Sequence, residues 1–288
     1  GGMRLPSWLT TRMTALMLRL LRAQIPEYST AVESLQSLQI NDGALVLEYT
    51  WNAELLEQAR ARGRELALPE DLRASARVYY ETLATQRQAL TRRGSLASPL
   101  RALFEQARER SVAGRDPALE NRAALLALGV AMNGQNPSFL YEEGSRPTAR
   151  VRRMASTLRG RHDLAQHFVI SATLALSGGG RLADAIGVFK ELSDSRGGSG
   201  FSFADLLADR AGVVMALRST GPEARRIQQL LAENSDEGIF MPPIEALPEG
   251  LQDLEFRRRY EDLDTKTYGR VRDEVEQRVE ALPLYHQQ

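Results

Sequence analysis

The feature that most constrains the fold is how rarely the sequence alternates with a period of two. Only the segment around residues 34–51 does so, where Leu45, Leu47 and Tyr49 lie on every second position after the turn Asn41-Asp42-Gly43. Period-two spacing around such a turn predicts a β-hairpin. Because a lone hairpin is marginal in water, helices must supply most of the core.

Elsewhere the apolar residues recur at helical spacing, and glycine or proline separates the periodic segments. The proline-rich segment 239–250 is expected to be extended and irregular. The sequence therefore predicts a mainly α fold, a multi-helix bundle with one small N-terminal β-hairpin. Its helices are expected over about 8–23, 52–63, 70–92, 96–113, 117–134, 147–159, 161–177, 181–194, 202–218, 222–234 and 251–281.

A length of 288 residues fits one large or two modest domains. We expect an N-terminal helical region over 1–145, which contains the hairpin, and a C-terminal helical region over 146–288. The second region holds a centre rich in acids, histidine and glycine at 160–215. It ends in a long charged helix at 251–281, which packs along the body or a partner.

Composition excludes several classes of protein. The 37 basic and 37 acidic residues balance to a net charge of +0, so the chain as a whole is not built to attract nucleic acid. The absence of cysteine excludes disulfides, thiolate zinc sites and cysteine nucleophiles. No apolar run reaches the roughly 18 to 20 residues of a transmembrane span. Gly1-Gly2 before Met3 is typical of a cloning remnant. The absence of a signal or anchor segment from this sequence is therefore weak evidence about where the protein acts.

Polar residues repeat along one face of three successive predicted helices. Asp163, His167 and Ser171 are spaced by four over 161–177. Glu191 and Asp194 share a face of the next helix, and Asp205 and Asp209 share a face of the third, with Gly212 one turn further on. The three faces are expected to turn toward one another.

Buried carboxylates require cations, hydrogen bonds or a metal, and the nearby cations are Arg161, Lys190, Arg196 and Arg210. One interpretation is structural: ion pairs and helix caps, such as Ser202 with Asp205, fix the packing of three helices.

The other interpretation is a functional polar pocket. One histidine with several carboxylates is an oxygen-rich set that suits a divalent metal ion, with His167, Asp205 and Asp209 as ligands. Glu191 and Asp194 would then be the catalytic carboxylates, and Lys190 or Arg196 would stabilise a developing anion.

A glycine-rich turn precedes the third of these helices. Arg196, Gly197, Gly198 and Ser199 could bind an anion through backbone N–H groups, and Asp163 lies within the same centre as a further ligand-binding candidate. The turn matches neither a Walker loop nor a dinucleotide fingerprint. A tight helix–helix connection is the alternative interpretation.

Two other polar features stand out. The segment 145–161 holds six arginines and no acid, a pattern that suits either an anionic ligand or a solvated face. Glu120-Asn121-Arg122 places polar residues at the start of an apolar helix, which predicts capping together with a salt bridge.

The segments HFVISATLAL, FKELSDS and GGSGFSFADLLAD resemble the core of the YfiM-type lipoprotein family of bacteria, and more distantly VanZ-like membrane proteins. The resemblance covers about residues 160–215, and the chain lacks the cysteine that would carry a lipid anchor. It implies a bacterial cell-envelope setting rather than an activity. The matching residues are His167, Phe168, Lys190, Glu191, Asp194, Gly200, Phe201, Asp205, Asp209 and Gly212.

Two functions follow as expectations. The first is a helical cell-envelope protein that binds a partner or an envelope polymer through the polar centre at 163–212. The second is a metal-assisted hydrolase that acts on an envelope polymer or lipid. Expected partners are an envelope polymer, a lipid or another envelope protein, and no nucleic acid. The expected location is periplasmic or membrane-associated, with the cytoplasm as the alternative.

Overall fold

The computed structural model describes residues 35–41, 44–49, 68–86, 90, 93–134, 136–142, 145–151, 154–178, 200–261 and 265–286. For 35–41 and 44–49 it describes the backbone alone. Contacts within the chain divide it into two units, Gly1–Pro69 and Glu70–Gln288. The division near residue 145 that the sequence predicted stays a prediction; helices α7 (Pro117–Met132) and α8 (His162–Gly178), on either side of that position, pack on each other.

The hairpin predicted from the alternating segment is present in the first unit. Strand β1 (Leu35–Asn41) pairs antiparallel with β2 (Ala44–Tyr49), and Asn41 faces Ala44 across the turn. The predicted helices at 8–23, 52–63 and 181–194 lie outside the described residues.

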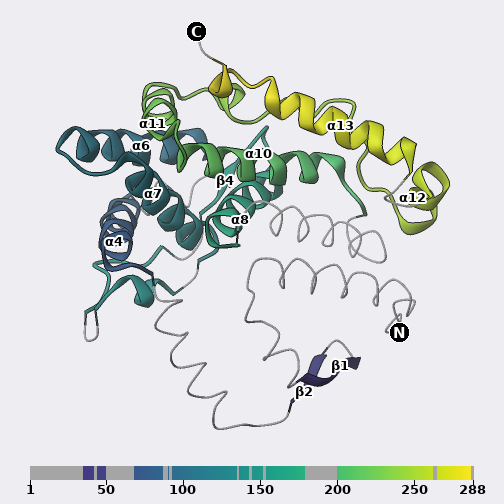
Figure 1. Cartoon of the computed structure of the whole chain (residues 1–288), viewed down its shortest axis with the longest axis horizontal. Coiled ribbons are helices and arrows are strands. Elements are labelled where there is room, and N and C mark those ends of the chain that lie inside the picture. Colours follow the sequence, from purple (N-terminus) through teal and green to yellow (C-terminus); the bar gives the residue numbers. More distant parts are fainter. Residues whose placement is uncertain are drawn as a thin grey trace. The chain divides into compact units, whose positions relative to one another are not determined.

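The second unit is mainly helical, as predicted (Figure 1). Helix α7 packs against α4, α6, α8 and α11, and α8 packs along α10, which α13 covers on another side. The helices are α4 (Glu70–Thr85), α6 (Ala97–Val112), α7 (Pro117–Met132), α8 (His162–Gly178), α10 (Phe203–Ser219), α11 (Ala224–Glu233), α12 (Asp253–Tyr260) and α13 (Lys266–Glu280), with 3-10 turns η1 (Pro137–Leu140), η2 (Glu237–Ile239) and η3 (Pro283–Tyr285).

The helix predicted over 147–159 is wrong. The described part of that segment contains no helix, and its strand β4 (Ser156–Thr157) pairs in parallel with β3 (Gly94–Ser95). Val151, Met154 and Leu158 are buried at helix-like spacing, although none of the three lies in a helix. The segment ends in a tight turn where Arg159 and Gly160 both have positive φ, a conformation that no α-helix contains.

The single helix predicted over 251–281 is also wrong, because α12 ends at Tyr260 and Glu261 has a φ of 58°. The break brings the rings of Tyr260 and Tyr268 to 6.3 Å between centroids. In an unbroken helix, eight residues would separate them by about 12 Å along the axis. Both rings thereby join Phe201, Phe203 and Phe256 in one aromatic cluster.

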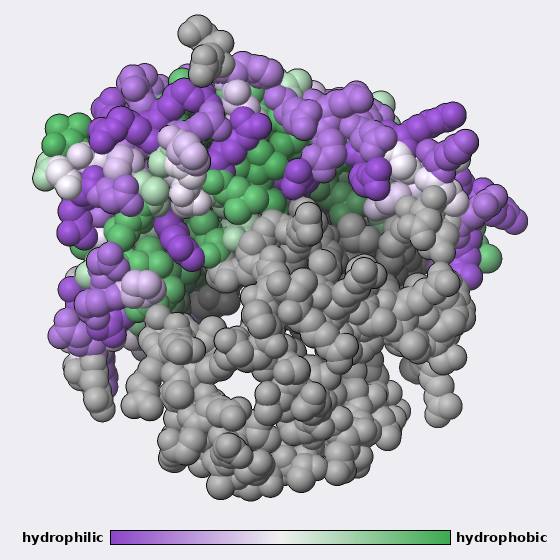
Figure 2. All heavy atoms as spheres, viewed as in Figure 1, coloured by the Kyte–Doolittle hydropathy of each residue, from purple (hydrophilic) through white to green (hydrophobic). Residues whose placement is uncertain are grey.

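Helix α4 is shorter than predicted and ends at Thr85 rather than near residue 92. The proline-rich segment after η2 is irregular, as expected. The surface over α12 and α13 is largely hydrophilic in Figure 2, in keeping with the many charged residues of these two helices.

Candidate functional site

The site lies between α8 and α10, whose backbones approach each other closely at Gly212. A Cβ atom added to Gly212 on α10 would lie 2.1 Å from the carbonyl oxygen of Phe168 on α8. Contacts below about 3 Å are not tolerated against backbone, so only glycine permits this packing. Asp209 lies one turn before Gly212 and therefore faces His167 and Ser171 across the helix pair.

The start of α10 is fixed by a helix cap. The Ser202 hydroxyl accepts a hydrogen bond from the backbone N–H of Asp205 at 3.1 Å, as the predicted cap requires. The cap sets the first turn of α10, from which the Asp205 side chain reaches both His167 and Arg161.

His167 lies between the two aspartates of α10. Its Nδ1 is 3.1 Å from Asp209 Oδ1, and its Nε2 is 3.5 Å from Asp205 Oδ2. The side chains of all three residues are at most 8% exposed. Each ring nitrogen of His167 therefore faces one carboxylate of α10.

Asp209 is satisfied on one oxygen only. Oδ1 accepts hydrogen bonds from the Ser171 hydroxyl, at 2.6 Å, and from His167. Oδ2 is buried and has no hydrogen-bond partner among the described residues. Buried carboxylate oxygens nearly always have a partner, so this atom requires an explanation.

Arg161 links the site to a segment far away in sequence. Its guanidinium pairs with Asp163 at 2.6 Å, with Asp205 at 3.3 Å and with Glu249. The hydrogen bond between Arg161 and Asp163 is the main cause that raises the pKa of the arginine and lowers the pKa of the aspartate. Arg161 therefore stays positive and offsets part of the buried negative charge.

Glu249 reaches this site through a close contact between two glycines. A Cβ atom on Gly200, whose φ is 90°, would lie 2.4 Å from the backbone of Gly250. Phe201 and Leu251 exchange backbone hydrogen bonds of 2.8 and 3.0 Å beside this contact. The sequence does not predict the role of Glu249, because nothing in the local pattern shows that 248–251 lies against 200–203.

The structure thus brings together some of the predicted residues. His167, Ser171, Asp205 and Asp209 converge, and Asp163 joins them through Arg161 while its own side chain is 51% exposed. The other predicted site residues lie outside the described residues, and their roles stay predictions: Lys190, Glu191, Asp194, Arg196, Gly197, Gly198 and Ser199.

A metal ion at this site also stays a prediction. Within the described ranges, no group of three or more histidine, aspartate or glutamate side chains is placed to hold a metal. A given nitrogen of His167 can either donate to a carboxylate or ligate a metal. The observed ring contacts therefore compete with the predicted ligation.

A second buried acid lies at the start of α7. Glu120 is 0% exposed and forms ion pairs with Arg110 at 2.6 Å and with Arg115 at 3.1 Å. It also accepts from Tyr79 at 2.6 Å and from Ser75 at 3.0 Å. The predicted salt bridge of Glu120 is therefore present, and both of its oxygens are satisfied.

Asn121, beside it, is buried and holds neighbouring helices together. Its amide donates to the carbonyls of Ser219 and Ala224 and accepts from Gln228 at 2.8 Å. Asp116, rather than the Glu120-Asn121-Arg122 triplet, caps α7 by accepting from the Leu119 N–H.

Among the helices that the structure describes, none combines the length and the apolar character needed to cross a membrane. Comparisons of the chain with protein-family models, with curated proteins and with solved structures find no match.

Proposed function

We propose that the chain is a bacterial cell-envelope protein that binds an envelope polymer or a partner through the polar centre formed by Arg161, His167, Ser171, Asp205 and Asp209. The envelope setting, periplasmic or membrane-associated, rests on the resemblance of residues 160–215 to the YfiM-type lipoproteins. The binding role rests on one observation, the buried Oδ2 of Asp209.

That oxygen is an acceptor without a donor. Leaving a buried charged acceptor unsatisfied costs about 1 to 3 kcal/mol or more, so a molecule that supplied a donor would recover this free energy. The small exposed fraction of Asp205 and Asp209, 7% each, limits such a molecule to one small donor group. Hydroxyl, amide and ammonium groups all qualify, and envelope polymers carry them.

The alternative, a metal-assisted hydrolase, would use His167, Asp205 and Asp209 as metal ligands and one carboxylate as general base. The ring contacts of His167 favour the binding of a polymer or partner without a metal, because both ring nitrogens face carboxylates.

The Asp209→Asn variant tests the proposal. In this variant the amide oxygen can still accept from Ser171 and His167, while the amide nitrogen takes the position of Oδ2 and replaces an acceptor by a donor. We expect the wild type to co-sediment with purified peptidoglycan sacculi and the variant to bind at least tenfold more weakly. Asp273→Asn, the same change at an exposed ion pair on α13, should bind like the wild type.

Metal analysis separates the two functions. We expect protein purified without chelator to contain no stoichiometric metal, and His167→Ala to leave the metal content unchanged. A stoichiometric metal that this variant loses would overturn the binding role in favour of the hydrolase. Equal binding by the wild type and Asp209→Asn would also overturn it.

A further inference from the structure

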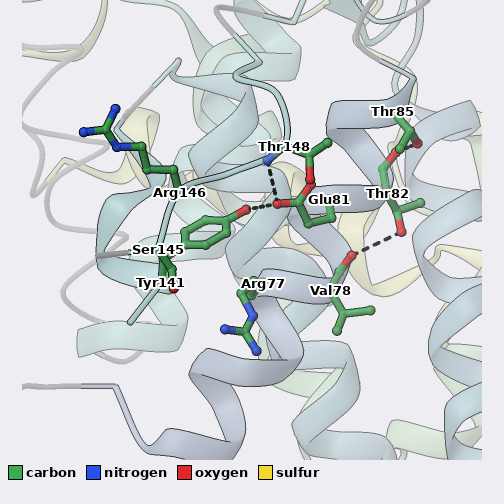
Figure 3. A pocket seen from close by; sticks show the side chains of 9 residues that line it. All are labelled: Arg77, Val78, Glu81, Thr82, Thr85, Tyr141, Ser145, Arg146 and Thr148. Atoms are coloured by element: carbon green, nitrogen blue, oxygen red, sulfur yellow. Dashed lines mark hydrogen bonds between the residues drawn. The ribbon is translucent and has the colours of Figure 1, made fainter. Parts of the chain in front are cut away.

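A pocket separate from the polar centre lies between α4 and the segment that follows η1. Its volume is about 610 Å³, within the range of small-molecule sites. Figure 3 shows its side chains, which come from the C-terminal half of α4 on one side and from the segment after η1 on the other. They are Arg77, Val78, Glu81, Thr82, Thr85, Tyr141, Ser145, Arg146 and Thr148.

Glu81 orders the walls of this pocket. Its Oε1 accepts hydrogen bonds from the Tyr141 hydroxyl and from the backbone N–H of Thr148, the latter at 3.1 Å. Partial burial acts to raise the pKa of Glu81, but these hydrogen bonds outweigh it and the pKa is lowered. The carboxylate therefore stays charged and ties the segment after η1 to α4.

The two arginines of the pocket, Arg77 and Arg146, form fewer and weaker polar contacts than Glu81. Arg77 approaches Glu142 at 3.8 Å, with the two side chains 37% and 66% exposed. Such a long, exposed pair contributes little. Arg146 is exposed and forms no hydrogen bond or ion pair with any residue that the structure describes. In Figure 3 the guanidinium groups of Arg77 and Arg146 lie on opposite sides of the Tyr141 ring.

The arginine-rich segment 145–161 thus divides into two parts. At its end, Arg159 binds the carbonyls of Met241 and Pro242, and Arg161 pairs with three acids. These arginines hold the fold together. At its start, Arg146 lines the pocket together with Arg77 of α4, and its donors form no hydrogen bond with a described residue.

We propose that this pocket binds a small molecule that carries an oxyanion, either a phosphate or a carboxylate, and that Arg77 and Arg146 recognise the anion. A guanidinium offers paired N–H donors in a planar fork that matches both groups. The hydroxyls of Ser145 and Thr85 and the apolar Val78 line the same space and would contact the rest of the ligand.

Titration calorimetry with inorganic phosphate and with succinate, each against chloride at matched ionic strength, tests the proposal. We expect one of the two anions to bind in the millimolar range or tighter, and the stronger one identifies the natural group. The Arg77→Gln/Arg146→Gln double variant should bind at least tenfold more weakly. Arg150→Gln, an exposed arginine of the same segment outside the pocket lining, should change affinity less than twofold.

A second variant probes the competition for Arg77. Glu142→Gln removes the exposed carboxylate beside Arg77 without touching the pocket wall, so it should strengthen anion binding several-fold. The proposal fails if neither anion binds better than chloride. It also fails if Arg150→Gln weakens binding as much as the double variant, since that result would indicate only a general attraction to positive charge.

Discussion

Glu120 and Asp209 are both buried acids on helices, but their surroundings differ. The two oxygens of Glu120 accept from Tyr79, Ser75, Arg110 and Arg115. Asp209 accepts from Ser171 and His167 on one oxygen, and its other oxygen is left without a donor among the described residues. A carboxylate whose acceptors are all filled has no capacity left for a ligand. One with an unfilled acceptor can still accept a hydrogen bond from a ligand, which is the basis of the proposed binding role.

The Glu120→Gln variant should produce the largest effect. It removes the acid at the centre of its cluster and leaves Arg110 and Arg115 without this counter-charge, while the new amide faces Tyr79 and the guanidinium groups with a donor. Breaking a buried ion pair in this way costs roughly 3 to 5 kcal/mol. Arg110 is 28% exposed and Arg115 is 46% exposed, so water partly solvates the arginine charges that lose their partner. We therefore expect the unfolding free energy to fall by about 3 to 4 kcal/mol.

Urea unfolding measures this loss. Glu109→Gln on α6 is the matched control, because Glu109 is exposed, and a surface change of this kind stays within about 0.5 kcal/mol. A loss below about 1 kcal/mol in Glu120→Gln would show that the filled cluster is not what stabilises this end of α7.

Acid should produce a slightly smaller effect through the same residue. Burial acts to raise the pKa of Glu120, but the hydrogen bonds from Arg110, Tyr79, Arg115 and Ser75 lower it to about 2 from its ordinary 4.5. Since the folded-state pKa is depressed, the contribution is present above about pH 4.5 and is lost as the pH falls toward 2. A tenfold change in a proton-binding constant corresponds to about 1.4 kcal/mol, so the stability lost in acid is about 3 kcal/mol.

The contribution of Glu120 is isolated by measuring the unfolding free energy of the wild type and of Glu120→Gln from neutral pH down to about pH 2. The lowered pKa of Asp163 adds the same acid sensitivity to both proteins. The difference between them should therefore shrink toward zero at acid pH. A difference that stays constant with pH would mean that Glu120 is not the titrating group.

These clusters also show what could be predicted from sequence. The faces of α8 and α10 were predictable because the spacings of His167, Ser171, Asp205 and Asp209 are local, and a helix of known period places them. Gly212 gave the further signal that the two helices could approach closely. The hairpin was predictable for the same reason, since its turn and its alternation lie within one short segment.

Contacts distant in sequence could not be predicted. The helix predicted over 147–159 failed because Val151, Met154 and Leu158 imitate helical spacing, while the segment pairs with Gly94 and Ser95. Arg161 was a predicted cation, but its partner Glu249 depends on the contact of Gly200 with Gly250. The partners of Glu120 come from other parts of the chain, so the sequence alone could not show that both of its carboxylate oxygens accept hydrogen bonds.

The smallest effect on stability is expected for Asp209→Asn, although this is the variant that should lose binding. Its amide oxygen keeps the hydrogen bonds from Ser171 and His167, and a buried charge with an unsatisfied oxygen disappears. The free energy lost with the attraction to His167 and the free energy gained by removing this buried charge should nearly cancel. We therefore expect the unfolding free energy in urea to change by about 1 kcal/mol or less. If Asp209→Asn instead destabilised the fold as much as Glu120→Gln, the vacant oxygen would belong to a structural cluster of the same kind, and the contrast between the two acids would disappear.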